Sequence, residues 1–343
     1  MAIKTAVLGY GLSGSVFHLP FLDHLSQYEV KSILSSQTGK IKSRYPHIQV
    51  KSTIESVLND PEIDLIINTL PNHLHYETTA QCLKAKKHVV VEKPFTVKSN
   101  NGIELIKIAK ENNRTLSVFH NRRWDFDFLI LKDKLSKNQF GNISLFESYF
   151  DRFRPTPAED WRNSNQMGSG VLYDLGPHLI DQALVLFGSP IEIFADLQNQ
   201  REHSKSIDYF SITLFYDNFR AVLRSSSLIA EPTPSFRIYG EVGCMSFPNF
   251  DPQEALLKEE VLPGSSHWES GVLKYLKSYN EKISLRDMSG QMSYYIELAK
   301  NLIGRDEIPV SAIDAVNGIR IIEDAIESDH KGLRVPFSPI KIL

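Results

Sequence analysis

The chain has 343 residues, more than one hydrophobic core usually holds and enough for two domains. Its formal net charge of −3 leaves no basic excess, and no apolar run approaches the roughly 20 residues that span a bilayer, so we expect no nucleic-acid or membrane partner. No secretory leader is recognisable and two cysteines are too few for a disulfide scaffold, so we expect a cytosolic protein with Cys82 and Cys244 as buried free thiols.

The first 120 residues alternate short β-rich runs with helical patterns. The β-rich runs cover residues 4–8, 30–34, 65–70, 89–91 and 116–119. The helical patterns fall at residues 17–25, 54–58, 76–85 and 103–109. This alternation predicts an α/β domain over residues 1–120, with a Rossmann-type, doubly wound parallel sheet between two layers of helices.

The pattern changes after residue 120. A helical stretch near residues 129–135 and a strand-like run at 143–150 precede an Arg- and Pro-rich loop at 151–157 and a helix that ends near residue 186. Four strand candidates then follow one another without long helices between them, at residues 191–197, 209–216, 220–226 and 236–239. We therefore expect a second, α+β domain over residues 121–343, with a large, mostly antiparallel open sheet and a helix over residues 312–328.

A glycine-rich loop lies where a dinucleotide-binding loop must lie, directly after the first strand. Gly9 permits a tight turn, Gly11 lets the backbone approach a pyrophosphate, and Gly14 lets the helix pack closely on the strand. The backbone N–H groups and the dipole of the following helix then favour the anion.

The ribose end of this site differs from the pattern that selects NAD. Such sites usually place an Asp or Glu after the second strand, but no acidic residue occurs between Lys31 and Ile54. The segment offers hydroxyl groups and cations instead, which suit the 2′-phosphate of NADP. We favour NADP and keep NAD as possible, because serine also bonds to a free ribose hydroxyl.

Two further segments carry residues of chemical interest. Lys93 lies just past the carboxyl end of the strand at 89–91, on the edge where open α/β sheets hold ligands. Asp174 and His178 are four residues apart and share a face if one helix begins near Tyr173, with Pro177 in its first turn. Such a pair either orients its own members or supplies two ligands of a metal ion.

These segments together resemble one known family. The loop from Gly9 to Gly14, the run Glu92-Lys93-Pro94 and the run Asp174-Leu-Gly-Pro-His178 occur in the same order across nearly the whole chain of the Gfo/Idh/MocA oxidoreductases. That family is named for glucose–fructose oxidoreductase and inositol dehydrogenase. Further segments are similar to a subgroup with NADP-dependent scyllo-inositol dehydrogenases, namely residues 121–125, 151–155, 161–162 and 172–182.

The resemblance implies a role for each matching residue. Lys93 is expected beside the nicotinamide and the reacting hydroxyl, Asp174 and His178 form the substrate-binding and acid/base pair, and residues 71–75 pass near the nicotinamide ribose. The residues assigned to the cofactor are Gly9, Gly11, Leu12, Gly14, Ser35, Ser36, Thr38, Lys40, Pro71, Asn72, His75, Glu92 and Lys93. Those assigned to the substrate are Asn121, Arg123, Arg152, Trp161 and Tyr173, with Trp124 and Arg154 as further candidates.

The expected function is that of an NAD(P)-dependent dehydrogenase acting on a CH–OH group of a cyclitol or sugar. Two alternatives remain, a dinucleotide-sensing regulator without turnover and a metal-dependent hydrolase or lyase that uses His73, His75, Asp174 and His178. We also expect a homodimer or homotetramer, because the strand at 209–216 alternates between an apolar face and a polar face and the helices are too few to cover both.

Overall fold

A computed structural model of the chain describes residues 2–157, 159–279, 288–304 and 306–341. The chain forms two compact units, each described here by itself. The first unit comprises Met1–Phe95, Asn100–Asp125 and Pro252–Ala312, and the second comprises Thr96–Ser99, Phe126–Asp251 and Ile313–Leu343.

The first unit is built on a six-stranded sheet in the order β3-β2-β1-β4-β5-β6, with every neighbouring pair parallel. This confirms the predicted Rossmann sheet. The strand order reverses between β1 and β4, and sheets of this kind bind ligands outside the carboxyl ends of the strands at that point. The strands are β1 (Ile3–Leu8), β2 (Tyr28–Leu34), β3 (Gln49–Lys51), β4 (Leu65–Asn68), β5 (His88–Val91) and β6 (Leu116–Val118).

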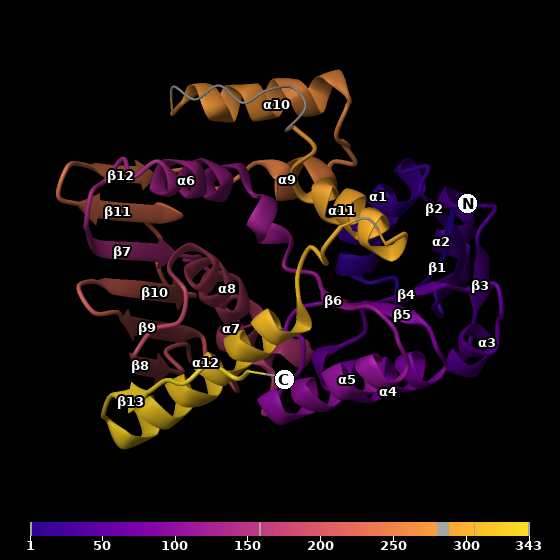
Figure 1. Cartoon of the computed structure of the whole chain (residues 1–343), viewed down its shortest axis with the longest axis horizontal. Helices are drawn as coiled ribbons and strands as arrows, with labels where there is room; N and C mark the ends of the chain where they lie inside the picture. The colour runs from indigo at the N-terminus through magenta and orange to yellow at the C-terminus, as the bar shows by residue number, and fades with distance from the viewer. Residues whose placement is uncertain (1, 158, 280–287, 305, 342–343) are drawn as a thin grey trace. The chain divides into compact units, whose positions relative to one another are not determined.

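Helices lie on both faces of this sheet. Figure 1 shows α4 and α5 on one face and α1 and α11 on the other. The α-helices are α1 (Leu19–His24), α2 (Thr38–Arg44), α3 (Ile54–Leu58), α4 (His75–Lys84), α5 (Ser99–Glu111), α9 (Gln253–Lys258), α10 (Ser266–Lys277) and α11 (Ser293–Leu302). Shorter helical turns are the π-helix η1 (Ser13–His18) and the 3-10 turns η2 (Asn72–Leu74), η3 (Asn121–Trp124) and η6 (Gly290–Met292).

The segment Pro252–Ala312 belongs to the first unit, although it lies far from it in sequence. The hydroxyl of Tyr28 donates to the carbonyl of Tyr295 at 2.7 Å, and the hydroxyl of Tyr294 lies 2.8 Å from Oγ of Ser117. Both contacts join α11 to strands of the Rossmann sheet. The compact units therefore do not follow a single boundary after residue 120.

The second unit is built on a seven-stranded sheet in the order β12-β11-β7-β10-β9-β8-β13. Among its described strands only β7 and β10 pair in parallel, which confirms a mostly antiparallel sheet. The strands are β7 (Ile143–Tyr149), β8 (Glu192–Gln198), β9 (Tyr209–Phe215), β10 (Arg220–Ser226), β11 (Phe236–Gly240), β12 (Cys244–Phe247) and β13 (Val335–Pro336). The helices are α6 (Phe126–Ser136), the turn η4 (Trp161–Asn163), α7 (Gly170–Asp174), α8 (Gly176–Phe187) and α12 (Ala312–Lys331).

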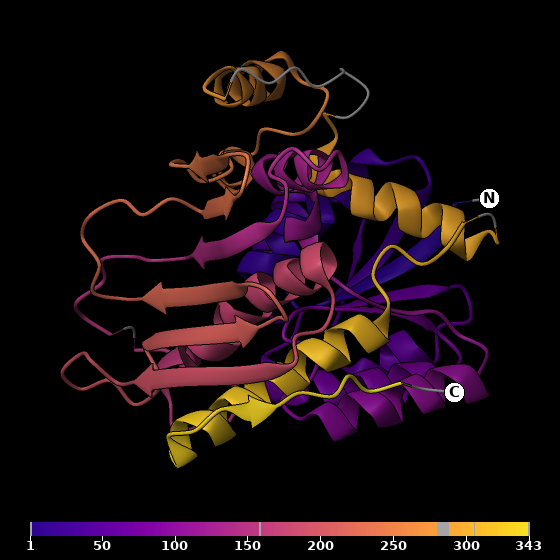
Figure 2. The same ribbon diagram turned by 60° about the vertical axis from the view of Figure 1, so that its left-hand side comes forward.

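In the part of the chain that the structure describes, helices cover one face of this second sheet and leave the other uncovered. Phe210, Ile212 and Leu214 on β9 are fully buried, and a Cβ atom at Gly176 of α8 would lie 3.9 Å from the Phe210 ring. Figures 1 and 2 show α8 and α12 along one face of this sheet. The alternate residues Tyr209, Ser211 and Thr213 are half-buried. The alternation expected along residues 209–216 is thus present.

Two expectations are wrong in detail. Cys244 is exposed, because it opens β12 at the edge of the sheet, whereas Cys82 is buried and burial raises the pKa of its thiol to about 12. The helix expected to run past Asp174 is broken, so α7 ends at Asp174 and α8 begins at Gly176. Pro177 has no N–H to donate to the carbonyl four residues earlier, which accounts for the break.

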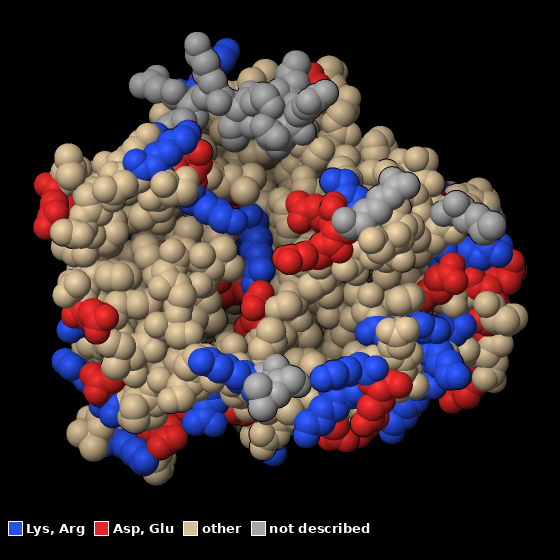
Figure 3. Space-filling view, viewed as in Figure 1, with Lys and Arg blue, Asp and Glu red and all other residues tan. Residues whose placement is uncertain are grey.

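Surface charge is mixed. On the face viewed in Figure 3, Lys and Arg side chains are interspersed with Asp and Glu, and no broad area carries one sign. Within the described part of the chain, no helix combines the length and the apolar character needed to cross a membrane.

Candidate active site

The loop after β1 has the geometry of a phosphate-binding turn. Gly9 has φ +105°, a conformation that favours glycine, and a Cβ atom at Gly14 would lie 2.5 Å from the Gly9 carbonyl oxygen. A Cβ atom at Gly11 would meet nothing within 4 Å, so the backbone there is open to an approaching ligand. Leu12 beside it is 52% exposed. The three glycines therefore show the turn, approach and packing roles that a dinucleotide loop requires.

The segment after β2 presents short polar side chains to solvent. Ser36, Thr38 and Lys40 are exposed, while Oγ of Ser35 accepts the N–H of Gln37 at 3.1 Å. Gln37 in turn donates to the carbonyl of Tyr10 in the glycine loop at 3.0 Å, which ties the two segments together. These groups lie at the carboxyl end of β2, where a Rossmann sheet holds the adenosine ribose.

His75 links two loops at the carboxyl edge of the sheet. Its ring is fully buried, with Nδ1 2.8 Å from the carbonyl oxygen of Pro94 and Nε2 2.8 Å from that of Leu70. Burial lowers the pKa of His75. Because both ring nitrogens face main-chain carbonyls, the ring holds the loop before Pro71 and Asn72 beside the loop that carries Lys93. No cluster of three or more His, Cys, Asp or Glu suited to a metal occurs among the described residues.

Lys93 is half-buried and follows β5, and the Glu92 carboxylate beside it is turned into the protein. Oε2 of Glu92 accepts the N–H of Lys93 at 2.9 Å, and Oε1 lies 2.9 Å from Nε2 of His18. The hydroxyl of Ser13 also donates to Oε1. Sequence reasoning placed Glu92 with the cofactor residues and did not identify His18, since nothing in the local pattern brings the two together.

In the second unit, the loop after β7 places two arginines on one side. Residues 152–154 run extended beside residues 226–229: the N–H of Arg152 donates to the carbonyl of Ser226 at 2.8 Å, and that of Arg154 to Ser227 at 2.7 Å. Side chains alternate along an extended chain, so both arginines point to one side and Phe153, 58% exposed, points to the other.

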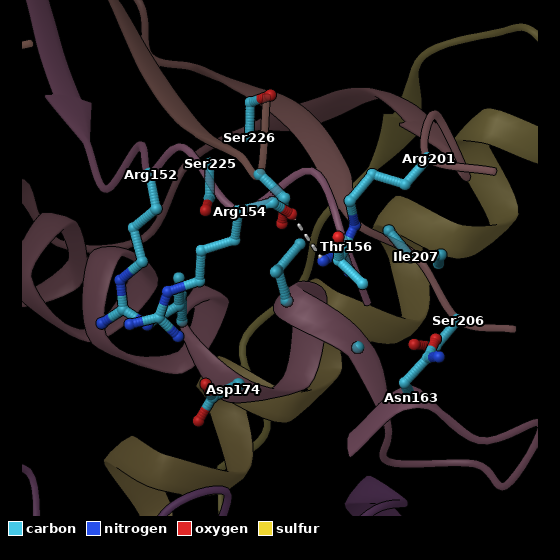
Figure 4. Close-up of a pocket in the computed structure, with 14 residues that line it drawn as sticks. Arg152, Arg154, Thr156, Asn163, Asp174, Arg201, Ser206, Ile207, Ser225 and Ser226 are labelled. Carbon is cyan, nitrogen blue, oxygen red and sulfur yellow. Dashed lines mark hydrogen bonds between the residues drawn. The ribbon is translucent and has the colours of Figure 1, made fainter. Parts of the chain in front are cut away.

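These arginines line a cavity of about 130 Å³ that also contains Asp174. In Figure 4 both guanidinium groups extend to the side on which Asp174 lies. Arg201 enters from the opposite side, bonded to the carbonyl of Arg154 at 3.0 Å and to the Asp208 carboxylate at 2.9 Å. The remaining polar lining comes from Thr156, Asn163, Ser206, Ser225, Ser226 and Ser227.

The other predicted substrate residues lie in different surroundings. His178 is buried in the first turn of α8, whereas Asp174 is the last residue of α7, so the two do not lie on one continuous helix as expected. The hydroxyl of Tyr173 lies 3.4 Å from the carbonyl of Val97, and burial raises the pKa of this tyrosine to about 12. Trp161 is half-buried in η4.

Asn121 and Arg123 lie in η3 of the first unit. Asn121 is buried and its amide donates to Gln291 at 2.9 Å, whereas Arg123 is half-buried. Of the predicted substrate and catalytic residues, Arg152, Arg154 and Asp174 are thus brought together at one cavity. Arg201 and the serines of residues 225–227 were missed, because only the fold places these separate strand ends around Asp174.

Comparison with known proteins covers both units. Residues 3–120 match the oxidoreductase family, NAD-binding Rossmann fold (GFO_IDH_MocA), and residues 132–337 match the oxidoreductase family, C-terminal alpha/beta domain (GFO_IDH_MocA_C). The chain is 38% identical over 337 residues to scyllo-inositol 2-dehydrogenase (NADP(+)) IolW of Bacillus subtilis (strain 168), which covers 96% of this chain and 94% of the relative.

Two further relatives agree over nearly the full length. The chain is 39% identical over 333 residues to the uncharacterized oxidoreductase YdgJ of Escherichia coli (strain K12), covering 95% of this chain and 96% of that protein. The solved structure of yvaA from Bacillus subtilis superposes with a TM-score of 0.91 at 36% identity, covering 98% of this chain and 99% of that one.

Proposed function

Because the chain belongs to the Gfo/Idh/MocA family of oxidoreductases and is an NAD(P)-dependent dehydrogenase, we propose that its cofactor is NADP and that its substrate is a cyclitol or sugar. The observation that carries the substrate class is the cavity at Asp174. Its guanidinium and hydroxyl lining offers many hydrogen-bond donors, as a ligand with several hydroxyl groups requires. The relative named as a scyllo-inositol 2-dehydrogenase supports the same class.

The choice of NADP rests on the exposed segment after β2. Ser36, Thr38 and Lys40 supply hydroxyl groups and a cation, and no carboxylate lies in this stretch to repel a 2′-phosphate. The relative named with NADP(+) supports this choice. We assign the pyrophosphate to Gly9, Gly11, Leu12 and Gly14, and the nicotinamide end to Pro71, Asn72, His75, Glu92 and Lys93.

The proposed chemistry divides between three side chains. When bound, the nicotinamide ring takes or gives the hydride. A neutral imidazole at His178 accepts the proton of the reacting hydroxyl, and the ammonium of Lys93 donates a hydrogen bond to the oxygen as negative charge develops on it. Asp174 accepts a hydrogen bond from a neighbouring hydroxyl of the substrate and so fixes which carbon faces the cofactor.

The substrate residues follow from the same assignment. Arg152 lies at the Asp174 cavity, and we propose that Asn121, Arg123, Trp161 and Tyr173 complete the surroundings of the substrate. We assign cofactor binding to residues 1–120 and substrate binding to residues 121–343. The two cysteines, Cys82 and Cys244, form no disulfide. Free thiols are in keeping with an enzyme of the reducing cytosol.

The decisive experiment is a screen of cyclitols and aldoses with NADP+ and with NAD+, followed at the absorbance of the reduced nicotinamide. We expect turnover of at least one cyclitol or sugar, with a higher kcat/KM for NADP+. Tight NADPH binding without turnover of any polyol or aldose would instead indicate a dinucleotide-sensing protein. A higher kcat/KM for NAD+ would refute the cofactor assignment.

The half-open sheet of the second unit supports a proposal on assembly. Its uncovered face carries Tyr209, Ser211 and Thr213 on β9, with Phe215 at the strand end beneath the guanidinium groups of Arg220 and Arg334. We propose that this face pairs with the same face of a second copy, in a dimer or tetramer.

A further inference from the structure

Three elements of the first unit meet at a buried hydrogen-bonded chain, here called the His18 chain, which consists of Tyr295, His18, Ser13 and Glu92. Nδ1 of His18 contacts the hydroxyl of Tyr295, and Nε2 lies 2.9 Å from Oε1 of Glu92. His18 and Tyr295 are fully buried and Glu92 is 8% exposed. Glu92 was assigned above to the nicotinamide end of the cofactor site, whereas Tyr295, His18 and Ser13 have no part in the function proposed above.

The protons of this chain can be placed from its acceptors. A carboxylate only accepts, so Nε2 of His18 carries the hydrogen that faces Glu92. Nδ1 faces the hydroxyl of Tyr295, which can either donate or accept a hydrogen bond. The ring of Phe119 packs against the imidazole with centroids 4.2 Å apart, which holds the ring in this orientation.

The π-helix η1 explains why two of its residues reach one oxygen atom. Ser13 and His18 are five residues apart, a spacing that would leave them about 140° apart around an α-helix of 3.6 residues per turn. In η1 the N–H of Leu19 bonds to the carbonyl of Gly14, five residues earlier. This wider turn reduces the angle between residues five apart, and both side chains reach Oε1 of Glu92.

The charge on Glu92 follows from these contacts. Burial alone raises the pKa of this carboxyl group, but the hydrogen bond and electrostatic attraction of His18 oppose it. The positive charge of Lys93 and the Ser13 hydroxyl act in the same direction as His18, and the pKa falls to about 2. Among the described residues, His75, Tyr294 and Tyr295 also interact electrostatically with Glu92.

We infer that His18 is a positioning residue for Lys93, acting through Glu92. Its imidazole, oriented by Tyr295, holds the carboxylate so that Oε2 accepts the N–H of Lys93 and fixes the turn that carries the reactive ammonium. This inference rests on the proposed function, because that function gives Lys93 its role.

The first test compares His18→Leu with His18→Gln. Leucine removes the donor to Glu92, whereas the glutamine amide replaces Nε2–H. We expect kcat to fall between about 10- and 100-fold in His18→Leu, with the NADPH Kd changed less than about threefold, and to stay within about threefold of wild type in His18→Gln. Equal losses in both variants would contradict the inference.

The pH profile separates positioning from a merely structural role. In wild type the Glu92 carboxylate is charged throughout the working range, because its pKa is about 2. In His18→Leu the hydrogen bond that opposes burial is lost, so we expect this pKa to rise. The ratio of variant kcat to wild-type kcat should then fall as the pH is lowered from 7.5 to 5. A ratio independent of pH would overturn the inference.

A second readout does not depend on turnover. In protein labelled with 15N-lysine, the amide of Lys93 should exchange with solvent at least about tenfold faster in His18→Leu, because its acceptor is no longer held. An unchanged exchange rate would overturn the inference even if activity fell. A wild-type protein inactive on every polyol would refute the proposed function, while the exchange rate would still decide the role of His18.

A matched pair of tyrosine variants covers the case in which His18→Leu does not fold. Tyr295→Phe removes the hydroxyl that orients His18, and Tyr294→Phe removes a neighbouring buried hydroxyl that bonds to Ser117 instead. We expect faster Lys93 exchange and a kcat loss of about 3- to 10-fold only in Tyr295→Phe. The same outcome in both variants would contradict the inference.

Discussion

The glycine loop permits a prediction that separates folding from cofactor binding. A Cβ atom at Gly14 would lie 2.5 Å from the carbonyl oxygen of Gly9 and 3.1 Å from Oγ1 of Thr69, against about 3.4 Å or more for an ordinary contact. The nearer atom is backbone, so the loop itself must shift by nearly 1 Å. Gly14→Ala should therefore destabilise the protein by about 1–3 kcal/mol without any cofactor present, the usual cost of overpacking.

A second glycine of the same loop should behave in the opposite way. A Cβ atom at Gly11 meets nothing within 4 Å, so Gly11→Ala should leave the stability of the cofactor-free protein unchanged. The new methyl group occupies the space through which the backbone approaches the pyrophosphate. We expect the NADPH Kd to rise at least about tenfold, which corresponds to about 1.4 kcal/mol of binding free energy.

Gly318→Ala is the matched control. Gly318 lies within helix α12, and its Cβ atom would make an ordinary contact of 3.9 Å with Cγ2 of Ile180. The variant should therefore bind NADPH normally and gain up to about 1 kcal/mol of stability, because alanine favours a helix more than glycine does.

Two measurements on each variant check the argument. Thermal unfolding without cofactor should show a drop of several degrees for Gly14→Ala alone, since 1 kcal/mol shifts the Tm of a domain of 150–250 residues by about 2–4 °C. A fluorescence titration with NADPH should show weakened binding for Gly11→Ala at unchanged Tm. Normal NADPH binding by Gly11→Ala, or an unchanged Tm for Gly14→Ala, would refute the assignment of the loop.

Three further predictions concern chemistry, cofactor choice and assembly. Lys93→Met and His178→Ala should each lower kcat by about 10²-fold or more, with NADPH binding retained at least in His178→Ala; near-normal turnover in both would show that the active site is misplaced. Ser36→Asp should lower the ratio of kcat/KM for NADP+ to kcat/KM for NAD+ by about ten- to a thousandfold, because the new carboxylate repels the 2′-phosphate. An unchanged ratio would show that Ser36 does not contact the 2′-phosphate. Light scattering at micromolar concentration should give a dimer or tetramer, and Val222→Glu on the open sheet face should dissociate it; a wild-type monomer would refute the proposal.

The fold was predictable where one local pattern decides the outcome. Short apolar runs alternating with helical patterns indicate a parallel sheet, and the strands at residues 4–8 and 220–226 fall where β1 and β10 are found. The position of Pro252–Ala312 was not predictable. Helical periodicity shows that a segment buries one face, but it does not say which sheet that face covers.

The candidate site was likewise predictable only where a local pattern marks its residues. The carboxyl ends of strands and the glycine spacing marked Lys93 and the phosphate loop directly. Asp174 was singled out by its spacing to His178, and Arg152 was found through the resemblance. Arg201 was not found, because it is held at the cavity by its ion pair with Asp208 and its bond to the Arg154 carbonyl. Such a residue carries no signal in its own stretch of sequence.

His18 shows the limit most clearly. The run at residues 17–25 fits an ordinary α-helix, and an α-helical spacing would not bring Ser13 and His18 to a common oxygen atom. The π-helical turn does so, and it puts the residue that holds Glu92 directly after the phosphate loop. If Lys93 depends on this chain, then the Glu92-Lys93-Pro94 signature is only the visible part of a unit that also needs η1 and α11. A protein that kept the signature but lost His18 or Tyr295 would then be a poor candidate for the same chemistry.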